Sequence, residues 1–299
     1  MIPPPAAVTT VAPPIAAGAP DGELQARLLR LYRVSVLKRQ KWEALRQAVG
    51  PTDGLRCLDI GGDNGVISYL FRRQGGAWTS ADLDAQTVEA IRAMVGERVI
   101  PLAEASWPFP DASLERVVFV DCLEHVRENG RFVEEACRVV VPGGRLIINT
   151  PLRKDSWLRR LRDAIGQTDA AHGHLRPGYT VEELRALIGP RGTLIAHRTY
   201  SKFFSQLVDT VMTAGIRAVK QQQSGAQVKG TVVTGQDVRR HETLFRLYRV
   251  SYPLLWLVAQ LDRLLWWRSG YMLLATVEVG PAPALARVGP GPVQAGVVR

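Results

Sequence analysis

The chain has 299 residues, of which 46% are hydrophobic and 22% are charged, and its formal net charge is +10. This composition excludes a disordered or fibrous chain and predicts a globular protein of one large domain or two small ones. The positive charge could indicate an anionic partner. No zinc-finger, helix-turn-helix or RNA-binding signature accompanies it, so we expect solvated basic faces and no nucleic-acid partner.

The N-terminal segments and the cysteines indicate how the fold begins and in which cell compartment the protein lies. Residues 1–20 are rich in Pro and Ala and lack a basic region before an apolar run, so we expect a flexible tail and no signal peptide. Residues 21–50 carry leucines at near-helical spacing, which predicts an N-terminal helix. The cysteines Cys57, Cys122 and Cys137 lie in apolar runs without metal-type spacing, which indicates reduced packing residues and a cytoplasmic protein.

Apolar runs and helical patterns alternate from residue 56 onward. Such alternation predicts a parallel sheet that is covered by helices on both faces. The expected strands are 56–60, 78–82, 99–102, 116–120, 145–150, 193–199 and 271–279. The expected helices are 66–74, 85–95, 129–139 and 180–187.

An insertion at residues 201–270 separates the last two expected strands. Its apolar residues between Phe204 and Val219 share one helical stripe, and a second stripe begins at Pro253 and ends at Leu265. Between them, residues 221–235 are polar and predict a mobile loop. The second helix is too short to span a bilayer. It therefore packs on the sheet, contacts a second subunit as a homodimer, caps an apolar acceptor, or lies on a membrane surface. Residues 280–299 predict another flexible tail.

The most informative stretch is Leu55 to Gly65, where a buried strand runs into a glycine-rich turn. Asp82 follows at the end of the next expected strand. Small residues leave backbone amides available at a helix N-terminus, and an acid about twenty residues on can accept hydrogen bonds from a ribose diol. The turn therefore predicts a nucleoside site. A nicotinamide fingerprint would need glycines at positions 63 and 66, where the chain has Asp63 and Val66.

Together with the stretches that begin at Trp107, Leu123 and Val141, this turn resembles the class I S-adenosylmethionine-dependent methyltransferases. The element Leu123-Glu124-His125 resembles their small-molecule branch in particular. The resemblance implies a Rossmann-like, mostly parallel seven-stranded sheet with helices on both faces, formed by residues 51–200 and 271–279. It implies S-adenosylmethionine as cofactor and methyl transfer to a small or lipid-like acceptor, at oxygen.

The resemblance also assigns cofactor contacts. In the family the acid at Asp59 orients the turn and the cofactor's amino group, the acid at Asp82 binds the ribose, and the residue at Leu83 lies against adenine. Asp63 replaces the middle glycine of the family turn, and aspartate tolerates the left-handed backbone that such a turn needs. Where the family places an acid for the adenine amino group, the chain has Ala103, with Glu104 beside it. The expected cofactor residues are Asp59, Gly61, Gly62, Asp63, Gly65, Asp82, Leu83 and Glu104.

Three polar residues are expected on the acceptor side. Asp121 and His125 follow the fourth strand, and His125 could take a proton from a hydroxyl acceptor, although it could equally belong to a helix start. His174 lies in a stretch that resembles the substrate-facing His-x-Arg-x-aromatic element of many relatives. His172 and His174 lack a carboxylate or cysteine at useful spacing, so we expect no metal site.

Two other functions remain open. A binding or scaffold protein that has lost catalysis would explain the departures at Asp63 and Ala103. A peripheral methyltransferase at the inner membrane, acting on lipid-linked glycan or quinone-like substrates, would explain the second amphipathic stripe and the net charge.

Overall fold

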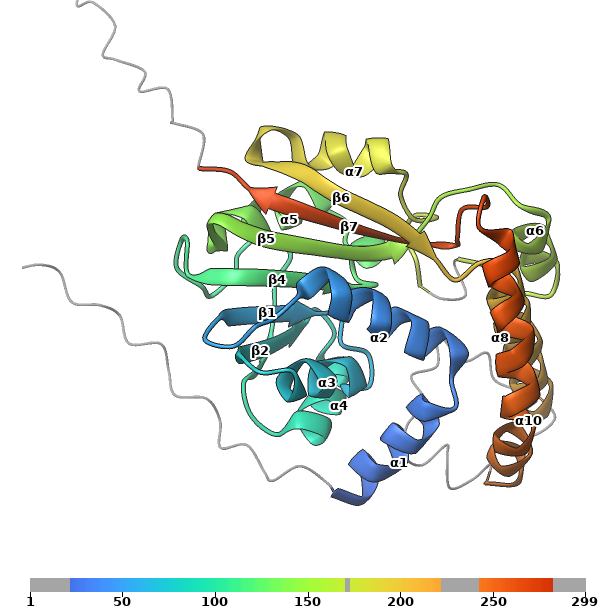
Figure 1. Cartoon of the computed structure of the whole chain (residues 1–299). Coiled ribbons are helices and arrows are strands. Elements are labelled where there is room, and N and C mark those ends of the chain that lie inside the picture. The colour runs from blue at the N-terminus through green and yellow to red at the C-terminus, as the bar shows by residue number, and fades with distance from the viewer. Residues whose placement is uncertain (1–21, 170–172, 222–241, 282–299) are drawn as a thin grey trace, which may run out of the picture.

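A computed structural model describes residues 22–169, 173–221 and 242–281 of the chain, and its centre is a seven-stranded sheet (Figure 1). The strand order is β3-β2-β1-β4-β5-β7-β6. β7 is antiparallel to both of its neighbours, and the other adjacent strands pair in parallel. The expected fold class, a Rossmann-like and mostly parallel sheet with helices on both faces, is confirmed. The strands are β1 (Arg56–Ile60), β2 (Ala77–Asp82), β3 (Val99–Pro101), β4 (Leu114–Val120), β5 (Val140–Pro151), β6 (Gly192–Tyr200) and β7 (Met272–Val279).

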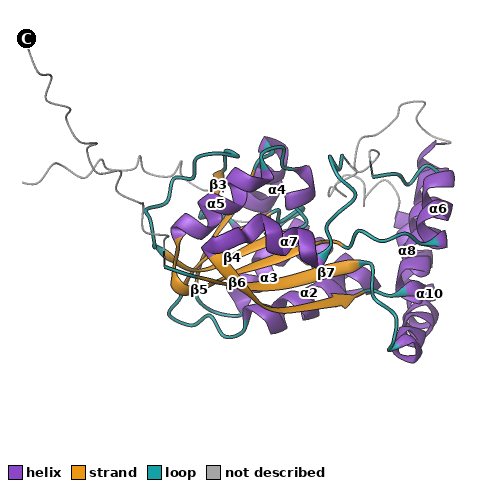
Figure 2. Cartoon of the chain, turned by 90° about the horizontal axis from the view of Figure 1, so that it is seen from above, coloured by secondary structure: helices purple, strands orange, loops and turns teal. Residues whose placement is uncertain are grey.

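Helices cover the sheet from both sides (Figure 2). Side chains of α5 and α7 join one apolar cluster, and side chains of α2 and α3 join another on the opposite face. Successive residues of β4 alternate between the two clusters, which is why its apolar run is continuous. The helices are α1 (Gly22–Arg33), α2 (Val36–Val49), α3 (Val66–Arg73), α4 (Ala85–Val95), α5 (Asn129–Val139), α6 (Trp157–Ala164), α7 (Val181–Ile188), α8 (Phe203–Gln221) and α10 (Glu242–Gln260).

The region before β1 forms two helices instead of the single helix that leucine spacing predicts. Ser35 ends the first segment and caps the second, because its hydroxyl accepts a hydrogen bond from the amide of Lys38 at 3.4 Å. This break lets α2 turn and lie along the sheet (Figure 1). The expected tail at 1–20, all but the first two residues of the expected tail at 280–299, and most of the expected loop at 221–235 lie outside the described residues.

The insertion supplies a helical layer at the carboxyl edge of the parallel strands, where β6 ends and α8 begins (Figure 1). α8 is confirmed, but the second helix differs from its prediction: α10 begins well before Pro253, and residues Leu261–Leu265 form the 3-10 helix η4. The short helix α6, which the sequence pattern missed, lies against α8 in the same layer (Figure 2). No described helix combines the length and apolar composition of a membrane span.

Candidate active site

The turn after β1 has the backbone that a nucleoside site requires. Gly61, Asp63 and Gly65 adopt left-handed φ angles of 89°, 53° and 79°. The expectation that Asp63 can stand in for a glycine here is confirmed, since aspartate is one of the few residues that adopt this conformation at modest cost. A Cβ atom at position 61 would collide with the carbonyl oxygen of Val120, so the turn approaches β4 too closely for any side chain.

Asp59 is fully buried beneath this turn. The hydroxyls of Ser68 and Ser80 donate hydrogen bonds to its two carboxylate oxygens at 2.5 and 2.8 Å, and the guanidinium of Arg72 lies 3.9 Å away. Burial raises the pKa of Asp59, and the Arg72 charge and the two hydroxyls oppose that shift. Its carboxylate therefore ties β1 to β2 and α3, and it fixes the turn from below.

Asp82 lies half-buried at the carboxyl end of β2, where the ribose-binding acid is expected. Its Oδ1 atom accepts a hydrogen bond from the amide of Asp84 at 2.9 Å. Burial raises the pKa of Asp82 to about 6, and the nearby carboxylates of Asp84 and Asp63 add to the shift. The neighbouring Leu83 packs partly against the sheet core. Asp84 caps α4 through the amide of Thr87, at 2.8 Å.

Glu104, unlike the other expected cofactor residues, binds the loop that precedes α5. Its carboxylate accepts hydrogen bonds from the amides of Arg127 and Glu128, at 3.3 and 3.1 Å, just before α5 begins. A carboxylate at a helix N-terminus is stabilised by the unpaired amides there. Glu104 thus holds the loop that follows β4, a role that its sequence neighbourhood does not indicate.

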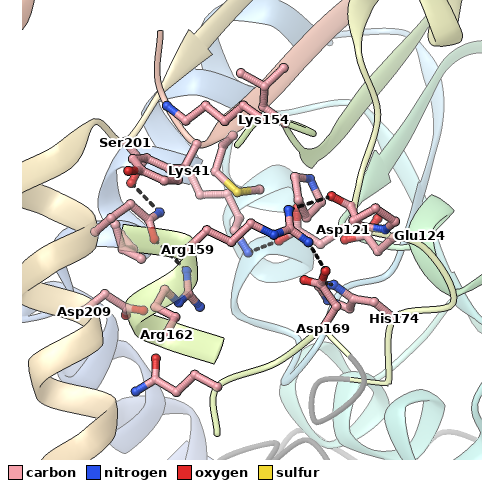
Figure 3. A pocket seen from close by; sticks show the side chains of 18 of the residues that line it. Lys41, Asp121, Glu124, Lys154, Arg159, Arg162, Asp169, His174, Ser201 and Asp209 are labelled. Atoms are coloured by element: carbon pink, nitrogen blue, oxygen red, sulfur yellow. Dashed lines mark hydrogen bonds and ion pairs between the residues drawn. The ribbon is translucent and has the colours of Figure 1, made fainter. Parts of the chain in front are cut away.

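A cavity of about 390 Å³ opens at the carboxyl edge of the sheet, between α2, α6, α8 and the ends of β4 and β5 (Figure 3). Its volume lies within the range that small-molecule sites use. Two of the expected acceptor-side residues, Asp121 and His174, line it, whereas the exposed His125 is not among the lining residues. The cavity is lined by both basic and acidic residues. The basic residues are Lys38, Lys41, Lys154, Arg159 and Arg162, and the acidic residues are Asp121, Glu124, Asp163, Asp169 and Asp209.

Asp121 is held by a polar chain that crosses the sheet edge. Lys41 of α2 forms an ion pair with its Oδ2 atom, and the amide of Asn149 donates to its Oδ1 atom. The hydroxyl of Tyr200 donates in turn to Asn149 at 2.8 Å. Burial alone would lower the pKa of Lys41, but the adjacent Asp121 carboxylate raises it, so Lys41 stays charged. Both carboxylate oxygens of Asp121 are therefore occupied.

Glu124 is fully buried in the cavity wall, and it is the acid with the most unusual environment. Thr150 donates to its Oε2 atom at 3.2 Å, whereas its Oε1 atom has no hydrogen-bond partner among the described residues. Burial raises the pKa of Glu124 to about 8, and the neighbouring Asp121 charge contributes to the shift. At neutral pH this carboxyl group is mostly protonated, and it can exchange a proton with a ligand in the cavity.

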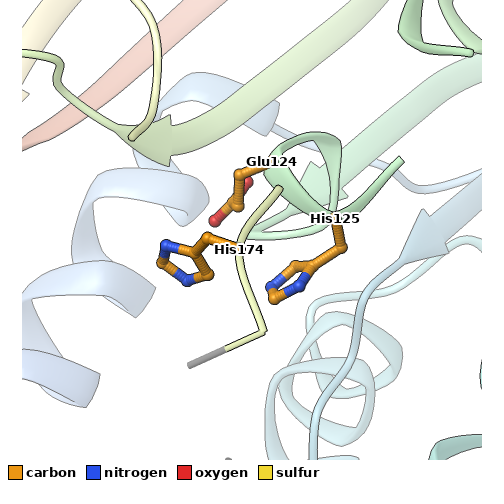
Figure 4. A group of neighbouring side chains, drawn as sticks. All are labelled: Glu124, His125 and His174. Atoms are coloured by element: carbon orange, nitrogen blue, oxygen red, sulfur yellow. The ribbon is translucent and has the colours of Figure 1, made fainter. Parts of the chain in front are cut away.

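The Glu124 carboxyl group lies close to His125 and His174 (Figure 4). The nearest ligand atoms of the three residues all lie within 4.8 Å of one another, and the two imidazole rings meet edge to face. The Nδ1 atom of His174 lies 3.6 Å from an oxygen of Asp169, and that of His125 lies 3.0 Å from the carbonyl oxygen of Gly173. Asp169 in turn pairs with Arg159 of α6.

This arrangement of a glycine turn, a strand-end acid and a cavity beyond β4 coincides with a known domain. The methyltransferase-domain family matches residues 58–148, which run from β1 to the middle of β5. This part of the chain is a methyltransferase domain.

Curated relatives resemble this chain over part of their length. A demethylmenaquinone methyltransferase of Tropheryma whipplei (strain Twist) is 30% identical over 123 residues, which cover 38% of this chain and 50% of that protein. A ubiquinone biosynthesis O-methyltransferase of Caulobacter sp. (strain K31) is 28% identical over 111 residues, which cover 33% and 42%. The match thus spans about half or less of these curated relatives.

The fold likeness extends further than the sequence match. The solved structure of a putative sarcosine dimethylglycine methyltransferase from Galdieria sulphuraria superposes with a TM-score of 0.51 at 14% identity. It covers 88% of this chain and 92% of that one. At this identity the comparison shows the fold, which agrees with the sheet order described above.

Sequence reasoning missed Lys41 and underrated Glu124. The only signal for Glu124 was its place in the Leu-Glu-His element, and nothing in the pattern around Lys41 relates it to a residue 80 positions away. The sequence predicts no metal site because no carboxylate accompanies His172 and His174 at useful spacing, but the fold brings the carboxyl group of Glu124 close to His174 and His125. His172 lies outside the described residues. Carboxylate and imidazole groups could hold a divalent cation, but the same groups serve equally as a proton relay.

Proposed function

We propose that this chain is an S-adenosylmethionine-dependent methyltransferase that methylates a hydroxyl group of a small, lipid-like acceptor in the cavity beyond β4. The observation that carries the proposal is the position of Glu124. It is a buried carboxyl group whose Oε1 atom has no hydrogen-bond partner among the described residues, and it lines an acceptor-sized cavity at the sheet edge where ligands of such folds bind. Quinone-type acceptors of two relatives support the chemical class of the acceptor.

The residues at the ends of β1 and β2 are suited to bind S-adenosylmethionine. The left-handed turn at Gly61, Asp63 and Gly65 brings backbone amides to the N-terminus of α3, and Asp82 offers a half-buried carboxylate at the next strand end. When bound, the cofactor supplies a methyl group on a sulfonium sulfur, and S-adenosylhomocysteine is the second product. Asp82 would hold the ribose diol, and Leu83 would lie beside the base.

On the acceptor side the protein's own residues orient the acceptor and accept the proton that its hydroxyl group loses. Methyl transfer to a hydroxyl group places the methyl carbon on the oxygen and releases the hydroxyl proton. Glu124 in its ionised form accepts that proton, since its pKa of about 8 is close to the working range of a general base. Lys41 and Asn149 hold Asp121 beside it, and the ammonium of Lys41 favours the ionised acceptor oxygen.

The direct test measures cofactor binding and methyl transfer separately. Isothermal titration with S-adenosylmethionine and S-adenosylhomocysteine should give micromolar binding to the wild type and weaker binding to Asp82→Asn. The matched control is Asp84→Asn, because asparagine also caps helices and the change removes a carboxylate only two residues away. Absence of binding to the wild type would overturn the proposal.

A scaffold function without catalysis is the second candidate, favoured by Asp63 in the turn and by its ion pair with Lys38 at 3.3 Å. Labelled methyl transfer to demethylated quinols and to a lipid extract would decide between the two. Cofactor binding without transfer to any fraction would favour the scaffold. A methylated lipid product would favour the enzyme.

A further inference from the structure

The helical layer at the carboxyl edge exposes an apolar surface that the methyltransferase fold itself does not need. We define the tryptophan face as the exposed apolar side chains of α10 and η4 between Leu254 and Leu264, together with the two tryptophans that follow. Its exposed fractions are high, at 80% for Trp266 and 65% for both Leu254 and Leu264. Monomeric soluble proteins rarely expose large contiguous apolar patches without a partner. The members of the tryptophan face are Leu254, Trp256, Leu257, Leu261, Leu264, Trp266 and Trp267.

The fold holds this face in place through a buried acid. Asp262 of η4 is only 8% exposed, and it accepts hydrogen bonds from the amides of Lys202, Phe204 and Ser205 at 2.9, 2.7 and 3.3 Å. It therefore caps the N-terminus of α8 from a distance of about sixty residues in the chain. The ammonium of Lys202 also donates to the carbonyl of Leu265 at 2.8 Å. The exposed leucines and tryptophans thus lie on an anchored segment.

The charged residues near the tryptophan face favour an anionic partner. Between Val250 and Ser269 the charged residues are Asp262, which is buried, and Arg263 and Arg268, which are exposed. A symmetric contact with a second copy would bury both arginines, and Asp262, the one acid of this segment, is itself buried and cannot pair with them. An anionic lipid surface instead attracts both arginines, and tryptophan is enriched at the level of lipid headgroups.

The cavity and the tryptophan face lie on neighbouring elements, because α8 lines the cavity and packs against α10 and η4. Arg159 and Arg162 of α6 line the cavity, while Trp157 and Leu161 of that helix are exposed, with Trp157 packed 5.3 Å from the ring of Phe203. Tyr271, four residues after Trp267, lines the cavity as well.

We propose that the tryptophan face docks on the surface of an anionic lipid bilayer, with Arg263 and Arg268 among the headgroups and the leucines below them. The docking itself is independent of catalysis.

Vesicle flotation of the full chain tests the docking. We expect the wild type to float with vesicles of phosphatidylcholine and phosphatidylglycerol, less so with phosphatidylcholine alone, and less at high salt. The double variant Trp266→Ser/Trp267→Ser should bind the anionic vesicles about tenfold more weakly. The matched control is Ile195→Ser, which removes an exposed apolar side chain on β6 and should float like the wild type.

Two results would overturn the proposal. One is a wild type that stays at the bottom of the gradient with both vesicle types, or a double variant that floats as the wild type does. The other is a wild-type dimer in light scattering that the tryptophan substitutions convert to monomer, which would assign the face to a second copy. Titration with S-adenosylmethionine in the same preparations keeps the outcomes apart, because intact cofactor binding without flotation removes the docking and leaves the proposed function standing.

Discussion

Lys38 of α2 lies 3.3 Å from Asp63, so a helix from the N-terminal segment reaches the acid that replaces the middle glycine of the cofactor turn. One turn further along α2, Lys41 pairs with Asp121 at the end of β4. Two lysines spaced three residues apart on one helix face thus neutralise the acids that follow two adjacent strands. Helix α2 in this way contributes residues to the candidate site.

The first prediction concerns the backbone at position 63. Asp63→Ala removes the ion pair and keeps a Cβ atom at a φ of 53°, whereas Asp63→Gly removes the pair and the conformational cost together. Glycine should therefore be more stable than alanine by about 1 kcal/mol. Urea unfolding of the two variants measures the difference directly. Equal stabilities would mean that the left-handed conformation at position 63 is not retained.

Most of the fold could be predicted from the sequence because local patterns determine it. α4 and α5 begin and end where their apolar periodicity predicts, and β1 matches its expected range. Other elements lack such a signal. α6 was missed because its eight residues bury a single side chain, Leu158, and carry arginines elsewhere. The break at Ser35 depends on the cap that its hydroxyl group forms. In the sequence alone, Ser35 cannot be distinguished from a polar residue on the surface of one continuous helix.

The site was predictable to the extent that it follows strand ends. Asp82 and Asp121 lie at carboxyl ends of parallel strands, as their positions after apolar runs indicate. The partners that determine their chemistry come from distant elements: Lys41 approaches Asp121 from α2, and His174 reaches Glu124 from a loop after α6. No local pattern encodes such pairings. The role of Glu124 in particular depends on its burial, which a motif cannot reveal.

The second prediction is a pH dependence of cofactor affinity. The carboxylate of Asp82 has a pKa of about 6, so it is ionised at neutral pH and becomes protonated as the pH falls below that value. A protonated acid is a weaker acceptor for a ribose diol, and affinity should fall by about ten- to a hundredfold on acidification. Calorimetry across this range should show the decline in the wild type and a flat profile in Asp82→Asn. An equal decline in both would assign the dependence to another group.

The third prediction concerns the buried cap of α8. Asp262→Ala leaves three backbone amides without their acceptor, and it should lower the free energy of unfolding by about 1–3 kcal/mol. Asp262→Asn retains an oxygen acceptor and should lose less. Urea unfolding followed by circular dichroism compares the two variants. An alanine variant as stable as the wild type would show that the cap contributes nothing to the layer.

The fourth prediction is the effect of Glu124 on the reaction. Because a general base works in its ionised form, the rate of methyl transfer should rise with pH and level off above about 8. Glu124→Gln should lower kcat by about 10²- to 10⁴-fold and abolish this rise. The exposed Glu128, four residues away, supplies the control Glu128→Gln, which should keep both the rate and its pH profile. A Gln variant whose residual activity still rises with the same midpoint would exclude Glu124 as the base.

The same carboxyl group should make the folded state less stable as the pH rises. The pKa of Glu124 is about 8 in the folded protein and near the ordinary glutamate value in the unfolded chain, so the folded state binds the extra proton between these values. Its contribution is therefore most favourable below the unfolded pKa and is lost as the pH rises through the folded one. Glu124→Gln cannot ionise, and its Tm should fall less than that of the wild type between about pH 5 and pH 8. Parallel Tm profiles for the two proteins would show that the carboxyl group is ionised in the folded state throughout.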